Sequence, residues 1–226
     1  MKKIFTIFTV VILTTTVSFA QFSAKVGLNM ANINTNTEGA ENEMKIGMII
    51  GGSYAMEISD EMNLDISLAF KQSGTKETTN LLGGSNTMTY SLNYLDISPN
   101  IAYKFSDQFG VSFGPYLAFA MSGKIEDETT ITNGPTTTES NSIEFGELTL
   151  DSDSPDGVSN MDFGINIGAT FFINDEMNVS AGYALGLSNI FKVNSDVKDV
   201  YDLLNEDVPS LKNNGIYLTF GYSFGG

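Results

Sequence analysis

Apolar residues recur at every second position along most of this chain, and that period constrains the fold more than any other feature. An amphipathic helix would repeat about every 3.6 residues, so the pattern predicts β-strands. Strands of soluble proteins usually run about five or six residues, whereas a tilted strand that crosses a bilayer needs about 9–11. Several of the alternating segments exceed ten residues. Eight segments show the alternation: 22–30, 46–58, 64–70, 95–105, 109–119, 161–173, 179–187 and 216–224.

The residues between the apolar positions are mostly Gly, Ser, Ala, Asn and Thr, as in Gly164, Asn166, Gly168 and Thr170. A soluble sandwich or a lipocalin-like barrel also alternates, but its inward face forms an apolar core and its outward face is polar. A face this small and polar suits a narrow lumen, with the apolar face turned to lipid. The pattern therefore favours a membrane barrel over the soluble alternatives.

The connections between these segments alternate in length. Three short ones resemble one another, at 59–63, 106–110 and 174–178, and end in Asn or Gly, which tolerate the left-handed conformation of tight turns. Four others are long and polar, at about 32–44, 72–89, 123–160 and 189–213. The prediction is an all-β fold: an eight-stranded antiparallel up-and-down transmembrane β-barrel with short periplasmic turns and long extracellular loops. Both chain ends then lie on the short-turn side.

The first twenty residues have the layout of a secretory signal peptide. Lys2 and Lys3 precede a short apolar segment at 4–13, and Ser18 and Ala20 are small residues before a cut at Gln21. A short N-terminal membrane anchor is the alternative. The predicted domains are therefore a signal peptide at 1–20 and an outer-membrane β-barrel domain at 21–226.

The composition excludes several function classes. The chain has no His, Cys or Trp, which removes Ser-His-Asp and Cys-His catalysis and Cys/His zinc sites. With 11 basic against 27 acidic residues and a net charge of −16, it is a poor candidate for binding nucleic acid. No catalytic constellation is recognisable, so we expect no enzymatic activity and no cofactor.

The charges on the inward face gather on the first four strands. One interpretation is a charged constriction or gate. The other is a structural network in which buried charges satisfy one another, and the narrow lumen of an eight-stranded barrel favours it. The predicted lumen charge network comprises Lys25, Glu57, Asp65, Lys71, Asp96 and Lys104, with Lys45 on the same face and Asp162 near the outer rim.

The third long connection is strongly acidic, with nine Asp and Glu residues against Lys124 alone. Asp151, Asp153 and Asp156 resemble part of a calcium loop and are the candidate residues for a weak divalent-cation site. The alternative is a solvated acidic loop, because the spacing of the acidic residues does not match an EF-hand.

The Thr-rich run at 129–138 suggests mobility. In the fourth connection, the spacing at 197–204 predicts a short helix capped by Ser195 or Asp196.

Two prolines lie on neighbouring predicted strands. If Phe105 pairs with Phe109 across the second turn, Pro99 and Pro115 face each other. Proline has no backbone N–H, so it is normally excluded from central strands. The sequence therefore predicts a local break or bulge between these two strands. The alternative is that a bulge shifts the register and separates the prolines.

Four stretches carry a family resemblance: Phe22-Ser-Ala-Lys-Val-Gly-Leu-Asn, Tyr94-Leu-Asp-Ile-Ser-Pro99, Gly114-Pro-Tyr-Leu, and Gly215-Ile-Tyr-Leu-Thr-Phe-Gly-Tyr-Ser-Phe224. Together they resemble the PorT-like family of outer-membrane β-barrels over nearly all of the chain after residue 20. The resemblance implies an eight-stranded barrel in a Gram-negative outer membrane. The family's naming member is tied to protein secretion, and that role is not transferred. The last strand also resembles the signal recognised by the barrel-assembly machinery.

These observations favour a non-enzymatic barrel of the cell envelope, whose loops contact the envelope or a partner. The alternative is a narrow channel for ions or small solutes. The expected partners are outer-membrane lipid and lipopolysaccharide, with the barrel-assembly machinery during insertion. The sequence names no specific protein partner.

Overall fold

The computed structural model describes residues 20–35, 42–81, 83–151 and 153–224, and the predicted signal peptide lies almost wholly outside them. The described chain contains nine strands and one helix. The strands are β1 (Ala20–Thr35), β2 (Glu43–Ser59), β3 (Met62–Leu81), β4 (Gly84–Lys104), β5 (Phe109–Ile131), β6 (Thr136–Ser142), β7 (Met161–Phe172), β8 (Met177–Gly186) and β9 (Leu211–Ser223), and the helix is α2 (Ser195–Leu204).

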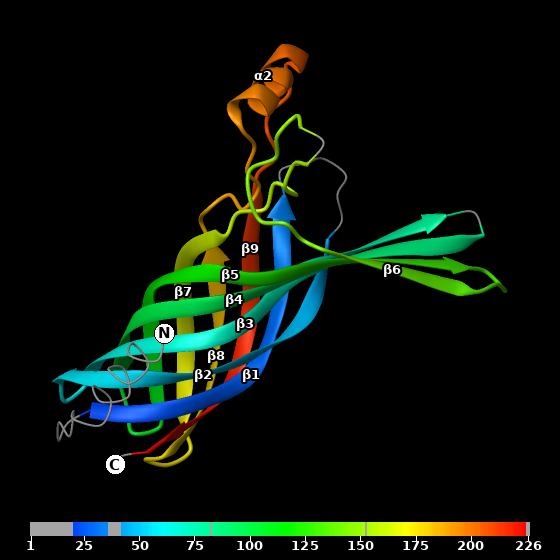
Figure 1. Ribbon diagram of the computed structural model, residues 1–226. Coiled ribbons are helices and arrows are strands. Elements are labelled where there is room, and N and C mark those ends of the chain that lie inside the picture. The colour runs from blue at the N-terminus through cyan, green and yellow to red at the C-terminus, as the bar shows by residue number, and fades with distance from the viewer. Residues whose placement is uncertain (1–19, 36–41, 82, 152, 225–226) are drawn as a thin grey trace, which may run out of the picture.

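Eight of the strands close into a ring (Figure 1). Each pairs antiparallel with its neighbours in the order β1-β2-β3-β4-β5-β7-β8-β9, and β1 pairs with β9 to complete the circle. Lys25, for example, lies between Gly51 of β2 and Gly221 of β9. The predicted eight-stranded antiparallel barrel is confirmed. The ninth strand, β6, was not expected and lies outside the ring.

The two faces of the ring divide as the alternation predicted. Apolar side chains point outward and are exposed, such as Phe113 at 56% and Ile167 at 58%. Their neighbours in sequence point inward, and Ser67 and Ala118 are 1% and 0% exposed. The interior is therefore built of small and polar side chains, while the exterior is a continuous apolar surface.

The three short turns lie at one end of the ring, together with the ends of β1 and β9 (Figure 1). The second turn is closed by the Phe109 N–H, which donates to the Ser106 carbonyl over 3.3 Å. In the third, the Asn174 side chain accepts the Met177 N–H over 2.7 Å. The Phe224 N–H donates to the Phe22 carbonyl at the same end. The expected geometry is confirmed, with the chain ends on the short-turn side.

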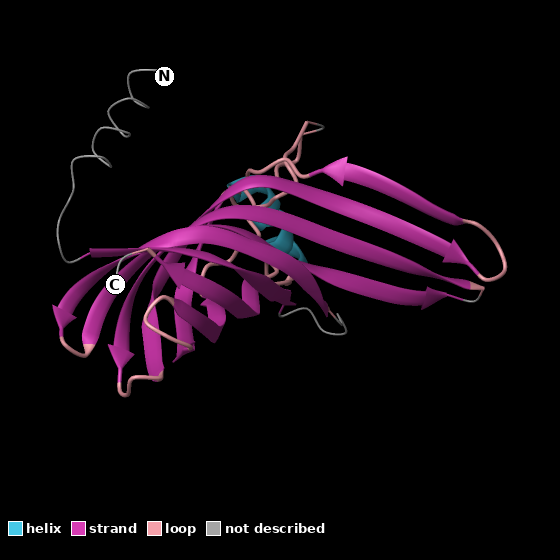
Figure 2. Ribbon diagram, turned by 90° about the horizontal axis from the view of Figure 1, so that it is seen from below, coloured by secondary structure: helices cyan, strands magenta, loops and turns pink. Residues whose placement is uncertain are grey.

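Two of the predicted long loops are instead largely β-structure. The second connection, at 72–89, continues the β3–β4 ladder without interruption as far as Leu81 and Gly84. The third begins as the outer part of β5, which pairs with β4 on one side as far as Ile131 and with β6 on the other side from Lys124 to Thr130. Figure 2 shows the resulting four-stranded sheet projecting beyond the ring. We call this the projecting sheet: residues 73–81, 84–93, 122–131 and 136–142 of β3, β4, β5 and β6.

A β-bulge at Met121 marks the point where the projecting sheet leaves the barrel. Asn93 pairs with Ser122 while Tyr94 pairs with Ala120, so Met121 has no partner in the ladder. The β5–β7 ladder ends two residues earlier, at Phe119. The extra residue lets β5 bend away from β7 while it keeps its pairing with β4.

The Thr-rich run and the helix also differ from expectation. The run at 129–138 is divided between β5, a tight turn and β6, so most of it is ladder and not the mobile segment that composition suggested. The helix does form, but it begins at Ser195 and its cap is Asn194, whose side chain accepts the Val197 N–H over 2.9 Å. Sequence spacing found the helix but chose the wrong capping residue.

The paired prolines behave as predicted. Ile97 pairs with Leu117 and Ile101 with Phe113, and no pairs join β4 to β5 between these two points. The register is the same on both sides of the gap, so Pro99 lies opposite Pro115 and no bulge intervenes. The flanking ladders continue, since Pro99 pairs with Ile66 and Pro115 with Ile165. The missing donors therefore fall in one place, as one local break in the ring.

Candidate functional site

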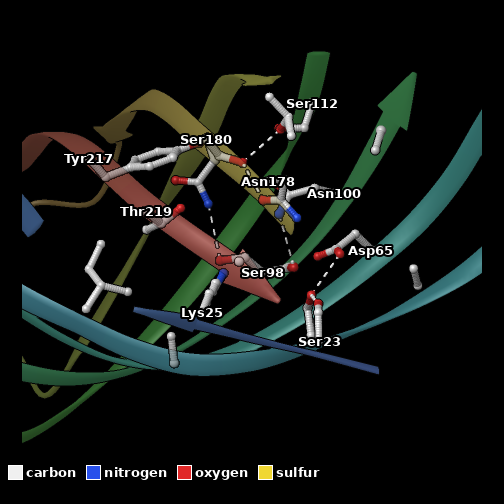
Figure 3. A pocket seen from close by; sticks show the side chains of 18 of the residues that line it. Ser23, Lys25, Asp65, Ser98, Asn100, Ser112, Asn178, Ser180, Tyr217 and Thr219 are labelled. Carbon is white, nitrogen blue, oxygen red and sulfur yellow. Dashed lines mark hydrogen bonds between the residues drawn. The ribbon is translucent and has the colours of Figure 1, made fainter. Parts of the chain in front are cut away.

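The lumen holds a polar cavity of about 230 Å³ in the half nearer the short turns. All eight strands of the ring contribute to its walls, from Ser223 near the turns to Asn29 further up. In Figure 3, hydroxyl, amide and charged side chains point toward one another across this space. A polar cavity of this size has room for several water molecules. The lumen is thus a polar chamber with room for water, not an apolar core.

Lys71 and Asp96 form the closest ion pair in the lumen, with 2.5 Å between Nζ and Oδ2. Ser98 donates its hydroxyl to the other carboxylate oxygen of Asp96. The ammonium of Lys71 also lies 4.4 Å from the centre of the Tyr116 ring, a cation–π distance. Asp96 is buried and Lys71 is largely shielded from solvent, and each has a partner of the opposite sign.

A second pair of opposite charges faces the same cavity without direct contact. Lys25 and Asp65 both line it, but they form no ion pair within 4 Å in the described part of the chain. Asp65 accepts the Ser53 hydroxyl over 2.9 Å, and Ser53 in turn contacts the Ser23 hydroxyl at 2.8 Å (Figure 3). Hydroxyl groups therefore link Asp65 to the wall beside Lys25.

The other predicted members of the network lie apart from this cavity. Glu57 is exposed at the turn end of β2. Lys104 is exposed at the end of β4, where its ammonium lies 5.2 Å from the Phe172 ring centre. The structure thus brings together Lys25, Asp65, Lys71 and Asp96 and leaves Glu57 and Lys104 at the rim. Strand ends protrude into solvent, so the alternation that points a side chain inward no longer buries it there.

A hydrogen-bonded layer centred on Asp162 crosses the lumen above the cavity. Its carboxylate is 2% exposed and accepts from Tyr116 at 3.1 Å, Ser188 at 2.5 Å and Asn213 at 3.0 Å. Asn213 also donates to the Tyr94 hydroxyl over 3.1 Å. The free volume at this level is about 10 Å³, about enough for a single water. We call these five residues the Asp162 layer.

Apolar side chains close the loop end above the Asp162 layer. Leu92 and Ile33 point inward from β4 and β1, and Ile143 and Ile190 pack onto them from the connections that follow β6 and β8. All four are buried, at 2–6% exposure. Among the described residues, the connections that follow β6 and β8 therefore form an apolar plug over the loop end of the lumen.

Sequence reasoning missed the Asp162 layer, although one signal was available. Tyr94 and Tyr116 occupy inward positions among small residues, and such large side chains require space on the opposite wall. A Cβ on Gly164 would lie 2.6 Å from the Tyr116 ring, so this glycine leaves room for it. Gly168 does the same for Tyr217, whose hydroxyl would lie 2.5 Å from an added Cβ. Pairing inward aromatics with inward glycines would have located Tyr116, one of the five residues of the layer.

The proposed cation site does not assemble. Among the described residues, no three acidic side chains converge as a metal site would require. Asp156 instead accepts the Glu144 N–H over 2.7 Å, so its carboxylate holds the loop backbone. On α2, the exposed Lys198 donates to Asp202 over 2.7 Å, and this contact raises the pKa of the Lys198 ammonium. Asp156, Lys198 and Asp202 thus serve local structure.

An aromatic rim surrounds the barrel at the turn end. The Phe22 and Tyr54 rings lie 4.9 Å apart, and Phe109 and Phe171 lie 5.2 Å apart, all on the outward face. Aromatic girdles flank the apolar band of proteins that cross membranes as barrels. A closed ring, an apolar exterior, a polar lumen and this rim define a transmembrane β-barrel. No helix in the described ranges is long and apolar enough to span a membrane.

Residues 15–192 match the model of the family described as outer membrane protein beta-barrel domain, and the chain belongs to this family. Its location is the outer membrane. No curated protein sequence matches the chain.

Several solved structures are similar to this chain. Ail, the attachment invasion locus protein of Yersinia pestis, is 12% identical over 91% of this chain and 99% of its own, with a TM-score of 0.42. Neisserial surface protein A is 10% identical over 91% of this chain and 99% of its own, with a TM-score of 0.44. The N-terminal β-barrel domain of Pseudomonas aeruginosa OprF is 10% identical over 88% and 97%, with a TM-score of 0.26.

Proposed function

We propose that this protein is a non-enzymatic and non-conducting barrel of the outer membrane, and that it presents its projecting sheet and loops to the envelope or to a partner. The observation that carries the proposal is the closure of the lumen at the loop end. The Asp162 layer leaves only about 10 Å³ of free volume, and buried Ile143 and Ile190 cover it. A protein built to conduct would keep a continuous polar path instead.

The charged groups of the lumen fit the same proposal as a structural network. Each buried charge is expensive unless an opposite charge or hydrogen bonds compensate it. Lys71 and Asp96 satisfy each other directly, while Ser53 and Ser98 donate to the carboxylates of Asp65 and Asp96. These contacts join the neighbouring strands β1 to β4 along one wall of the barrel, and the charges need not gate a path.

Further parts of the proposal rest on sequence. Residues 1–20 act as a signal peptide, so the mature chain begins at Gln21 and residues 21–226 form the barrel domain. The barrel-assembly machinery inserts it, lipopolysaccharide surrounds its outer half, and its finer affiliation is PorT-like. N-terminal sequencing of the protein from purified outer membranes tests the cleavage, and a first residue other than Gln21 would contradict it.

Single-channel recording in planar bilayers tests the main proposal. The expected result is no discrete conductance steps from the purified barrel. Replacing Ile143, Ile190 and Leu92 together by Ala removes the plug and should increase ion leakage while the barrel remains folded. Discrete steps from the unmodified protein would favour the alternative, a narrow channel for ions or small solutes.

A further inference from the structure

The strand β6 ends the projecting sheet. It pairs with β5 on one side, and no described strand pairs with its other side. All seven of its residues are exposed. The remaining strands have two neighbours each within the ring, but in the projecting sheet β3 from Glu77 to Leu81 pairs with β4 alone among the described strands. The barrel fold therefore removes free edges from the membrane and leaves two in the projecting sheet, of which β6 is the longer.

The hydrogen-bond phase shows which backbone groups of β6 are free. The Ile143 N–H donates to the Gly123 carbonyl, and the Ile131 N–H donates to the Pro135 carbonyl. In an antiparallel ladder such bonded residues alternate with residues whose N–H and C=O point away from the partner. Since 143 and 135 bond toward β5, the even-numbered residues of β6 point their backbone groups away. These are Thr136, Thr138, Ser140 and Ser142.

Apart from the single charge of Glu139, this edge lacks the features that usually protect an edge strand. Natural edges carry Pro, Lys, a bulge or a short strand to prevent pairing with other chains. The seven residues of β6 contain no Pro and no Lys, and their register with β5 has no bulge. Three are Thr, a β-branched residue that favours strands. The edge is thus competent to accept another strand.

The charge around β6 indicates the chemistry of that strand. The β5–β6 hairpin carries Glu126, Asp127, Glu128 and Glu139 against Lys124. Glu139 is the charged residue of β6 itself, and Asp127 is its partner on the same face of the sheet. A strand added to the edge would lie about 4.8 Å from β6, well within the Debye length of about 8 Å at physiological salt, and about twice as far from β5. Cationic side chains facing Glu139 would therefore be favoured.

We propose that β6 is a docking edge for an extended, basic segment of a partner protein, which adds a fifth strand to the projecting sheet. The inference rests on the proposed function, because it names the kind of partner that the loops present themselves to. Main-chain hydrogen bonds from the even-numbered residues supply affinity, and Glu139 with Asp127 selects for Lys or Arg. A second copy of this chain fits poorly, because each copy brings the same acidic hairpin and a net charge of −16.

A seven-residue peptide of alternating Lys and Thr, fluorescently labelled, is the probe. Its binding to the full barrel in detergent micelles is followed by fluorescence anisotropy. Peptides of alternating Glu and Thr, and of Lys and Thr with a central Pro, are the peptide controls. The expected result is saturable binding of the Lys-Thr peptide, with at least tenfold weaker binding of both controls.

Two variants of one position separate edge pairing from charge attraction. Thr138→Pro removes an edge donor without removing a bond to β5, and it should weaken binding about tenfold. Thr138→Val keeps the N–H and should bind the peptide as the unmodified protein does.

A variant of the neighbouring position tests the charge. Glu139→Lys should weaken binding by repelling the Lys side chains of the peptide. Retention of heat-modifiable migration in gels verifies that each variant is folded.

Amide hydrogen exchange gives a second readout. The peptide should slow exchange at Thr136, Thr138, Ser140 and Ser142, with little change on β1 or β8. Equal binding by Thr138→Pro and Thr138→Val would overturn the proposal and leave only non-specific charge attraction. The barrel could also form dimers in the absence of peptide. If Thr138→Pro abolished such dimers, the edge would bind a second copy of the chain, and the proposal would be overturned. Discrete conductance steps in planar bilayers would contradict the proposed function but would leave the peptide-binding results unchanged. Failure of the proposed function and failure of the docking proposal are therefore distinguishable.

Discussion

The strand β4 passes through two different surroundings, and its two halves differ accordingly. It keeps one uninterrupted register with β3 along its whole length, so its outward face is the same face throughout. In the barrel that face carries Leu95, Ile97 and Ile101, whereas in the projecting sheet it carries Thr87 and Thr89. The alternation continues while its chemistry changes. The medium outside the sheet therefore decides the residue type, and the strand geometry does not.

The same contrast holds for two ion pairs. Lys71 and Asp96 lie inside the barrel with side chains 14% and 8% exposed, at 2.5 Å. Lys124 and Glu126 lie on the projecting sheet at 49% and 39% exposure, at 2.9 Å. Two pairs of similar geometry thus sit in very different dielectric surroundings. Interaction strength should follow burial, because exposed pairs are screened by water and salt.

Removing one member of each ion pair should give the largest difference. Lys71→Met should lower the free energy of unfolding by about 3–5 kcal/mol, because it leaves the Asp96 carboxylate buried without its cation. Lys124→Met should change it by about 0–1 kcal/mol. Urea unfolding of both variants in lipid vesicles measures the two values. Equal losses would show that the lumen screens charge as well as the outer solvent does.

The second largest difference should come from placing an arginine on the outward face, which should destabilise the barrel but not the projecting sheet. Ile167→Arg or Leu117→Arg should cost about 2–4 kcal/mol if these side chains face the middle of the lipid. Thr87→Arg, on the outward face of the projecting sheet, should stay within about 0.5 kcal/mol. The measurement is again unfolding in vesicles. A neutral result at Ile167 would mean that this face does not contact lipid.

Adding volume inside the lumen should lower the free energy of unfolding by a smaller amount, through a steric clash and not through an unpaired charge. An added Cβ at Gly168 would lie 2.5 Å from the Tyr217 hydroxyl, so Gly168→Ala should cost about 1–3 kcal/mol through overpacking. Combining it with Tyr217→Phe removes the nearest atom and should recover part of that loss. If the double variant is no more stable than the single one, the clash lies with the backbone of β8 instead.

Proteolysis of intact cells tests which end of the barrel faces outward. Of the changes considered, it should affect the stability of the barrel least. Added protease should cut within 123–160, and the irregular part from 143 onward is the expected target because 123–142 is largely paired in β5 and β6. The barrel should remain folded after cutting, as judged by heat-modifiable migration in gels. Cutting at Asp60 or Asp175 in intact cells would place the short turns outside and invert the topology.

The sequence alone determined the ring. Period-2 alternation, segments long enough to cross a bilayer and three similar short turns were sufficient to predict eight antiparallel strands, their inward and outward faces and the shared location of both chain ends. The opposition of Pro99 and Pro115 followed from turn position alone. These features are local or nearly local: side-chain direction repeats every two residues, and a tight hairpin fixes the register of the strands that it joins.

Only the tertiary structure decided what the polar residues do. The segments 72–89 and 123–142 are polar on both faces, so no alternation distinguishes their strands from loops, and pairing with β4 orders them. The Asp162 layer joins Tyr94, Tyr116, Ser188 and Asn213 from distant parts of the chain, and no local pattern encodes such a meeting. Alternation tells which way a side chain points, but closure of the ring decides which side chains it meets. That physical difference separates the barrel, which could be predicted, from the plug and the projecting sheet, which could not.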